Sequence, residues 1–149
     1  AVLTPNLPKI YVDNSLDYKH RYKDQYPVSY DIQFNFMHAF LAQLKQEGIK
    51  VLVVGMPLTK ENRLLLSSGF WQGFRGRLAE ECQQSGAEYL DLSASPDFSL
   101  ADFCDTVHLN ADGGARLAEH VSQAIEQSPQ LRAALKERLE PLRQTASPK

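Results

Sequence analysis

The stretch Val51-Leu52-Val53-Val54-Gly55 decides the fold of this chain. Every position in it is apolar or glycine, so both faces would be buried. This is typical of a central strand in a parallel sheet that helices cover on both sides. Pro57 follows and ends the strand, because proline cannot donate a hydrogen bond to a neighbouring strand. A second run, Tyr89-Leu90-Asp91-Leu92, predicts another parallel strand.

Helical patterns alternate with these two strands. The predicted boundaries are N-caps at Ser29, Thr59 and Asn110, stops at Gly48 and Gly86, a break at 67–69, and a new start at Ser128 with Pro129. The apolar stripe of the helix before the first strand is expected to contain Ile32, Phe36, Met37, Phe40, Leu41 and Leu44. This alternation predicts an α/β fold, a three-layer α/β/α sandwich with a parallel sheet. With only two convincing strands and one weaker candidate at 10–12, the sandwich is expected to be incomplete.

The predicted organisation has four parts: an irregular N-terminal arm at 1–28, an α/β domain at 29–127, a terminal helix at 128–143 and a disordered tail at 144–149. In the arm, tyrosines recur every four residues, which predicts one helical face; they are Tyr18, Tyr22, Tyr26 and Tyr30. Basic residues between these aromatics would suit a nucleic acid. Because acidic residues also occur there, an arm packed on the domain with its charges in water is the preferred interpretation.

Composition argues against several classes of protein. Hydrophobic residues make up 43% of the 149 positions, enough for a folded core. The net charge of -2 gives no basis for a nucleic-acid partner or an anionic membrane surface. No apolar run reaches the roughly 18 residues of a membrane span. Histidines, cysteines and carboxylates do not recur at ligand spacing, so we expect no metal and no cofactor. A disulfide between Cys82 and Cys104 stays open, and so does the cellular compartment.

Chemistry is predicted in the segment Asp105-Thr106-Val107-His108-Leu109-Asn110. An acidic residue three positions before a histidine on a loop can fix the orientation and tautomer of the imidazole, leaving the other ring nitrogen to accept a proton. We therefore predict Asp105 and His108 as the catalytic residues, with His108 as general base. In the structural alternative, Asp105 caps the loop and His108 bonds to a backbone carbonyl. Asp102 is a competing acid on the same loop.

Three further features have both a functional and a structural interpretation. Cys104 could act as a nucleophile, but a small buried hydrophobic residue is the preferred interpretation. Trp71 and Phe74 could line a substrate pocket, although aromatics at helical spacing usually belong to a core. Gly113-Gly114 could cradle a phosphate at a helix N-terminus. Without a GxGxxG or Walker pattern around them, these glycines are expected to let the helix pack closely on the loop.

From Ile49 to about Ile125 the chain resembles the SGNH (GDSL-like) hydrolase superfamily. The run from Asp105 to Asn110, followed by Gly113-Gly114, is similar to the DxxH block of that family. The segment Gly55-Met56-Pro57-Leu58-Thr59 and the HLN…GG run look like uncharacterised SGNH-like proteins that are more distantly similar to the D-alanine transfer protein DltD. The resemblance implies a flavodoxin-like fold and an esterase or acyltransferase acting on acyl esters of small molecules or glycans. It makes His108 the base and Asp105 the residue that orients it.

The family pattern also contains a serine nucleophile after the first strand, and a glycine and an asparagine that complete the oxyanion hole. The nearest match is Asp13-Asn14-Ser15-Leu16, in which Asn14 departs from the pattern before the serine. We expect instead that the half carrying the nucleophile precedes Ala1 and that this chain alone is inactive. An unpaired sheet edge would then favour self-association. The alternative function is a non-catalytic α/β interaction module.

Overall fold

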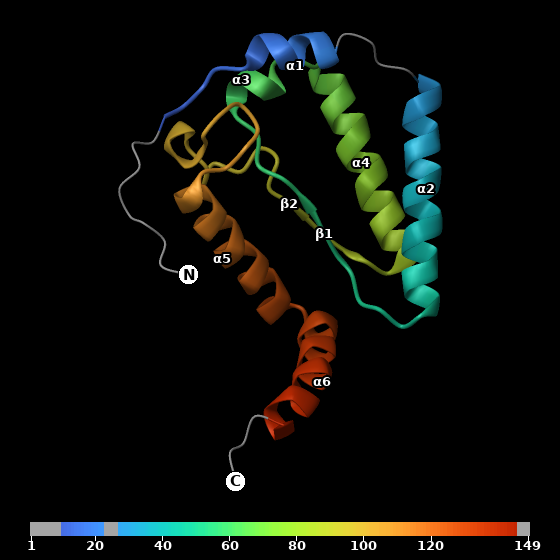
Figure 1. Ribbon diagram of the computed structural model, residues 1–149. Coiled ribbons are helices and arrows are strands. Elements are labelled where there is room, and N and C mark those ends of the chain that lie inside the picture. Colours follow the sequence, from blue (N-terminus) through green and yellow to red (C-terminus); the bar gives the residue numbers. More distant parts are fainter. Residues whose placement is uncertain (1–9, 23–26, 146–149) are drawn as a thin grey trace.

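A computed structural model describes residues 10–22 and 27–145 (Figure 1). Helices and short strands follow one another as α1 (Ser15–Arg21), α2 (Pro27–Gln46), β1 (Leu52–Gly55), α3 (Lys60–Arg63), α4 (Ser68–Ser85), β2 (Glu88–Asp91), the 3-10 helix η1 (Leu100–Asp102), α5 (Ala111–Gln127) and α6 (Pro129–Thr145). The fold is therefore α/β with a small parallel sheet, as the sequence predicts. Within the described residues, no helix combines the length and the hydropathy needed to cross a bilayer.

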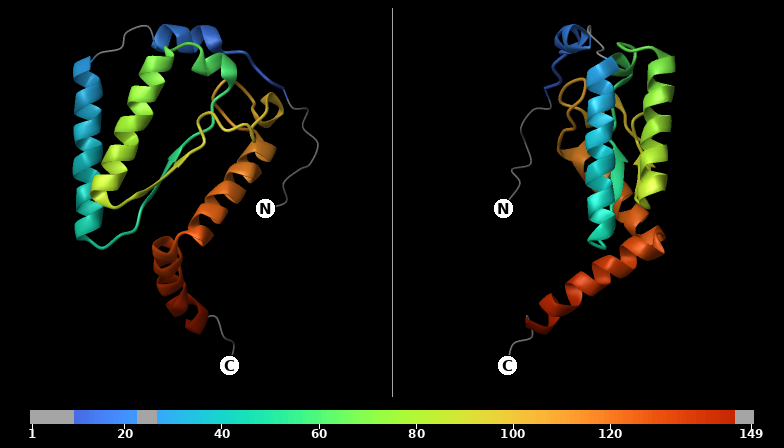
Figure 2. Two further views of the ribbon diagram at one scale, coloured as in Figure 1. Left: turned by 180° about the vertical axis from the view of Figure 1, so that it is seen from behind. Right: turned by 90° about the vertical axis from the view of Figure 1, so that its right-hand side faces the viewer.

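The sheet consists of β1 and β2, paired in parallel with Leu52 opposite Glu88 and Gly55 opposite Asp91. Helix α4 connects the two strands and packs on β2, while α2 packs on α4. Figures 1 and 2 show the strands between α5 on one side and α4 with α2 on the other. In the described residues β1 has a strand partner on one side only, and its residues are half-buried. The central position predicted for this strand is therefore not seen.

Most predicted helix boundaries are confirmed by cap geometry. The side chains of Thr59, Ser67 and Asn110 accept backbone N–H groups of the first turns of α3, α4 and α5. Gly48 and Gly86 follow α2 and α4 with φ values of 71° and 73°, a left-handed conformation that favours glycine. These local signals fix where the chain enters and leaves each helix around the sheet.

The N-terminal segment differs from its prediction. Residues 15–21 form α1 instead of irregular structure, and Val12 makes one parallel bridge to Asp105 instead of a strand. Helix α2 begins at Pro27, two residues before the predicted cap Ser29, because the fixed φ of proline suits the first helical position. The tyrosine pattern is therefore divided between α1 and α2, and Tyr26 lies outside the described residues.

The C-terminal boundary also differs slightly. Helix α6 starts at Pro129, as predicted from Ser128 with Pro129, and continues to Thr145. The prediction placed its end at 143 and a disordered tail after it. The remaining tail residues, 146–149, lie outside the described residues.

Helix α2 has two apolar faces, and in the part of the chain that the structure describes one of them is packed and the other is exposed. Its Tyr30 and Phe34 join Phe70, Trp71 and Phe74 of α4 in an aromatic cluster with ring centroids 4.8 to 6.5 Å apart. The other face forms a stripe one turn apart that is exposed to solvent; its members are Val28, Ile32, Phe36 and Phe40. The predicted core stripe is thus wrong for Ile32, Phe36 and Phe40, because α2 rests on α4 through its other face.

Candidate functional site

The loop between β2 and α5 brings Asp105 and His108 together beyond the carboxyl end of β1. Thr59 follows β1 by four residues, and its backbone N–H and Oγ1 donate to the carbonyl oxygen of Thr106 at 3.3 and 3.0 Å. The side chains of Asp105 and His108 then meet directly, with Oδ2 of Asp105 2.7 Å from Nδ1 of His108. The loop therefore presents the pair at the edge of a parallel sheet where ligands of α/β folds bind.

The hydrogen bonds of Asp105 determine its charge. Its Oδ1 accepts the backbone N–H groups of Val107 at 2.8 Å and His108 at 2.7 Å. Burial acts to raise the pKa of Asp105, but these two hydrogen bonds and the His108 ring outweigh it, so the pKa lies below its ordinary value. The group is therefore an ionised carboxylate at neutral pH.

The ionised carboxylate in turn assigns the proton on the imidazole. A carboxylate only accepts hydrogen bonds, so Nδ1 of His108 must be the donor in the 2.7 Å contact. In the neutral ring, Nε2 then carries a free lone pair. The His108 side chain is 67% exposed while that of Asp105 is 17% exposed. A fixed, accessible imidazole of this kind can accept a proton from a nucleophile.

Asp102, the competing acid, has other partners. Its Oδ2 accepts the N–H and hydroxyl of Ser99, and its Oδ1 lies 3.4 Å from Nε of Arg116. It is buried, and it ties η1 to α5. The backbone carbonyl of Asp102 also lies against Gly113, where a Cβ atom would come within 2.1 Å of it. The close packing predicted for the two glycines is confirmed for Gly113 and wrong for Gly114, where a Cβ atom would meet nothing within 4 Å.

The two candidate nucleophiles of the described residues have no hydrogen bond to the His108 ring. The hydroxyl and N–H of Ser15 both bond to Asp13 and lower the pKa of that carboxyl. Cys104 is exposed, so its prediction as a buried residue is wrong; its Sγ contacts the backbone oxygen of His108 at 3.4 Å. The reason is that Phe103 takes the buried position, and successive side chains in an extended segment point to opposite faces.

The structure also decides between the functional and structural interpretations of the cysteines and of the aromatic residues of α4. Cys82 and Cys104 are both free thiols, so the disulfide that the sequence left undecided is not formed. Phe74 belongs to the aromatic cluster, as the core interpretation predicted, whereas Trp71 also lines a cavity of about 380 Å³. In the described part of the chain, histidines, cysteines and carboxylates form no group of three that could hold a metal.

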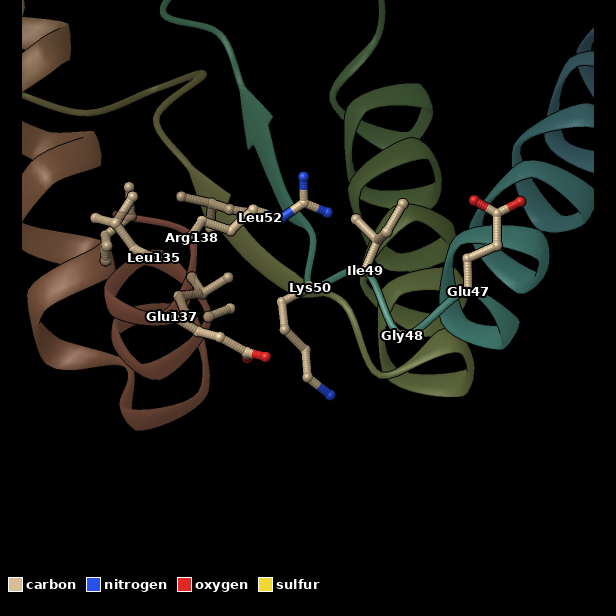
Figure 3. Close-up of a pocket in the computed structure, with 11 residues that line it drawn as sticks. Glu47, Gly48, Ile49, Lys50, Leu52, Leu135, Glu137 and Arg138 are labelled. Carbon is tan, nitrogen blue, oxygen red and sulfur yellow. The ribbon is translucent and has the colours of Figure 1, made fainter. Parts of the chain in front are cut away.

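A pocket of about 860 Å³ lies between α6 and the segment that connects α2 to β1 (Figure 3). Ile49, Leu52 and Leu135 give it apolar walls. The charged side chains that line it are of both signs, Lys50 and Arg138 with Glu47 and Glu137. This pocket borders the amino end of β1, whereas His108 lies beyond the carboxyl end. It is therefore separate from the candidate site.

Comparison with known families decides the affiliation. The sequence matches the family described as DltD protein over residues 10–126, more than half of the chain. The chain belongs to the DltD family. Comparisons with curated proteins and with solved structures gave no match. The DltD match runs from Ile10 to Glu126 and so includes α1, both strands and the loop that carries Asp105 and His108.

The charge of Asp105 should make the stability of this DltD-family chain depend on pH. Its folded-state pKa is depressed, so its contribution is present above the ordinary carboxyl pKa and is lost as pH falls through the folded value. We expect Asp105→Asn to lower the free energy of unfolding near neutral pH, and the deficit to shrink on acidification. Urea denaturation at a series of pH values measures this. Asp17→Asn, on exposed α1, is the control. A deficit that is constant with pH would contradict the assignment.

Proposed function

We propose that this chain supplies the general base of an ester-hydrolysis or acyl-transfer site, with His108 as the base and Asp105 as the residue that orients it. The observation that carries the proposal is the 2.7 Å contact between Nδ1 of His108 and the ionised Asp105, on a ring that is otherwise open to solvent. Membership of the DltD family supports a hydrolase or transferase related to D-alanine esterification. We further propose that the fold is of the SGNH type.

In the proposed reaction a serine hydroxyl attacks the carbonyl carbon of an acyl ester carried by a small molecule or a glycan. Nε2 of His108 takes the hydroxyl proton, and Asp105 stabilises the imidazolium that forms. The same proton then passes to the leaving alkoxide, and the acyl group stays on the serine until water or an acceptor alcohol removes it. We propose that the serine and the oxyanion donors are not among the described residues that contact Asp105 and His108.

The test is hydrolysis of short p-nitrophenyl esters. We expect the 149-residue chain alone to show no activity above background, because a base without its nucleophile and oxyanion donors supplies little of the rate enhancement. A longer protein that contains this chain together with its nucleophile should be active, and removal of His108 should abolish most of that activity.

A non-catalytic interaction module is the second candidate function, and the exposed face of α2 favours it. Two large aromatic side chains on this face, Phe36 and Phe40, are 69% and 60% exposed. Val28 and Ile32 extend the same stripe by two turns. Contiguous apolar surface of this kind marks a contact surface in soluble proteins. Among the described residues β1 has a strand partner on one side only, and the other edge of such a strand can pair with a further chain.

Self-association of the 149-residue chain is the expected consequence. Size-exclusion chromatography with light scattering should show a mass that rises with concentration. Phe36→Ser with Phe40→Ser should lower that mass toward the monomer, because the double substitution removes apolar area from the stripe. Leu64→Ser is the matched control, since Leu64 is equally exposed but follows α3. A wild-type chain that stays monomeric at high concentration would rule this expectation out.

A further inference from the structure

Thr106, between the two site residues, has every polar atom bound by another segment. Its side chain is fully buried. Its hydroxyl and backbone N–H donate to Oδ1 of Asn14 at 2.5 and 3.2 Å, and its carbonyl accepts two hydrogen bonds from Thr59. Acid–base chemistry at Asp105 and His108 does not itself require a buried threonine between them. The burial therefore indicates a role in holding the loop.

Asn62 is the second partner of this hydroxyl. It is fully buried in α3, and its Nδ2 donates to Oγ1 of Thr106 at 3.3 Å. Its Oδ1 accepts the hydroxyl of Tyr22 at 3.2 Å. Burial, with Tyr18 nearby, raises the pKa of Tyr22, so this hydroxyl keeps its proton and remains a donor. The hydrogen bonds thus run in one direction, from Tyr22 through Asn62 and Thr106 to Asn14.

Asn14 bonds to Thr106 instead of capping its own helix. It occupies the N-cap position of α1, where an asparagine side chain normally accepts a backbone N–H of the first turn. Here it makes no such bond, because its Oδ1 accepts both donors of Thr106. The oxygen is assigned without ambiguity, since a backbone N–H can only donate. The same segment bridges the loop through Val12, whose N–H donates to the carbonyl of Cys104.

We propose that Asn62 and Asn14, acting through Thr106, are positioning residues that hold Asp105 and His108 in their hydrogen-bonded arrangement. Asp105 depends on the N–H groups of Val107 and His108, whose directions follow from the backbone of Thr106. If the Thr106 peptide rotates, Asp105 loses these two donors, and its carboxylate no longer accepts the hydrogen bond from Nδ1 of His108. Neither asparagine contacts the imidazole ring. This inference rests on the proposed function for its catalytic meaning, but its geometry is independent of activity.

The tautomer of the His108 imidazole tests the proposal. Long-range ¹H–¹⁵N NMR of the neutral imidazole in the 149-residue chain should show the Nδ1–H form in the wild type. In Thr106→Val, which keeps the shape and removes the hydroxyl, we expect a mixture with the Nε2–H form. Asn62→Ala and Asn14→Ala should give the same mixture. Thr106→Ser restores the hydroxyl and should restore the single tautomer.

Controls separate positioning from general destabilisation. Asn35→Ala, on the exposed surface of α2, should leave the tautomer unchanged. A purely structural role would lower the thermal midpoint of the Thr106 and Asn62 variants yet keep the wild-type tautomer well below that midpoint, and this result would overturn the proposal. If Thr106→Val fails to fold, Asn14→Ala decides, because Asn14 is only half-buried.

Turnover gives a second measurement that is independent of the tautomer. In a longer protein with ester hydrolase activity, Thr106→Val should lower kcat by roughly 10- to 100-fold with little change in KM, as expected for a misplaced base. If no protein containing the chain hydrolyses esters while the variants still change the tautomer, the proposed function fails and the positioning role stands. Unchanged kcat together with an unchanged tautomer would remove the positioning role alone.

Discussion

Replacement of His108 by alanine is expected to lower the turnover of ester hydrolysis by about a thousandfold or more in a protein that joins this chain to its nucleophile. The size of the effect follows from the way a nucleophile, a base and its orienting carboxylate act as one unit. Without Nε2 the serine proton has no acceptor, and the leaving alkoxide has no donor. Initial rates with p-nitrophenyl acetate and butyrate, measured for both proteins, give the ratio.

The matched control is His120→Ala. His120 lies on α5 and contacts Asp97 at 3.2 Å, away from the contact between Asp105 and His108. It should keep wild-type turnover. A longer protein that is inactive on a broad ester panel and insensitive to loss of His108 would favour the interaction module. If the 149-residue chain itself hydrolyses esters and Ser15→Ala abolishes that activity, the nucleophile is Ser15, and the site is complete within this chain.

Two adjacent glycines in α5 should respond to the same substitution with opposite signs. Gly113→Ala would place its Cβ 2.1 Å from the backbone oxygen of Asp102, and a backbone atom cannot swing aside as a side chain does. We expect a loss of about 3 kcal/mol in the free energy of unfolding, at the upper end of overpacking effects. Helix α5 and η1 must separate to admit the methyl group.

Gly114→Ala is the internal control for this prediction. A Cβ there meets nothing within 4 Å, so the substitution brings only the better helix propensity of alanine. It should raise the free energy of unfolding by roughly 0.5 to 1 kcal/mol. Urea denaturation of both variants checks the pair. Equal effects of the two substitutions would contradict the close approach of α5 to Asp102.

The parts of the structure that the sequence predicts are those determined by near neighbours. The caps at Thr59 and Asn110 and the stops at Gly48 and Gly86 are each decided within four residues, and all four are confirmed. The contact between Asp105 and His108 spans three residues, and the spacing indicates it. Its catalytic role stays a prediction.

The features that sequence reasoning missed depend on contacts between distant segments. Nothing around Asn62 in the sequence indicates that it is fully buried against Thr106, 44 positions away. The two apolar faces of α2 look alike in the sequence, and only the position of α4 decides which one is covered. The sequence predicts the wrong face for Cys104, because side chains alternate along an extended loop and the bridge between Phe103 and Leu109 sets which of them are buried.

The hydrogen bond between Thr106 and Asn14 has a consequence for folding during synthesis. It joins positions 92 residues apart, so α1 leaves the ribosome long before its partner. At a synthesis rate of about 5 to 20 residues per second, the delay is roughly 5 to 20 seconds, whereas helices form within microseconds. During that interval Thr106 does not yet occupy the Oδ1 of Asn14, so this N-cap side chain is available to the first turn of α1. Tyr18 of α1 is then open to chaperones and proteases, and the segment reaches its final place only after the loop that contains Thr106 has been made.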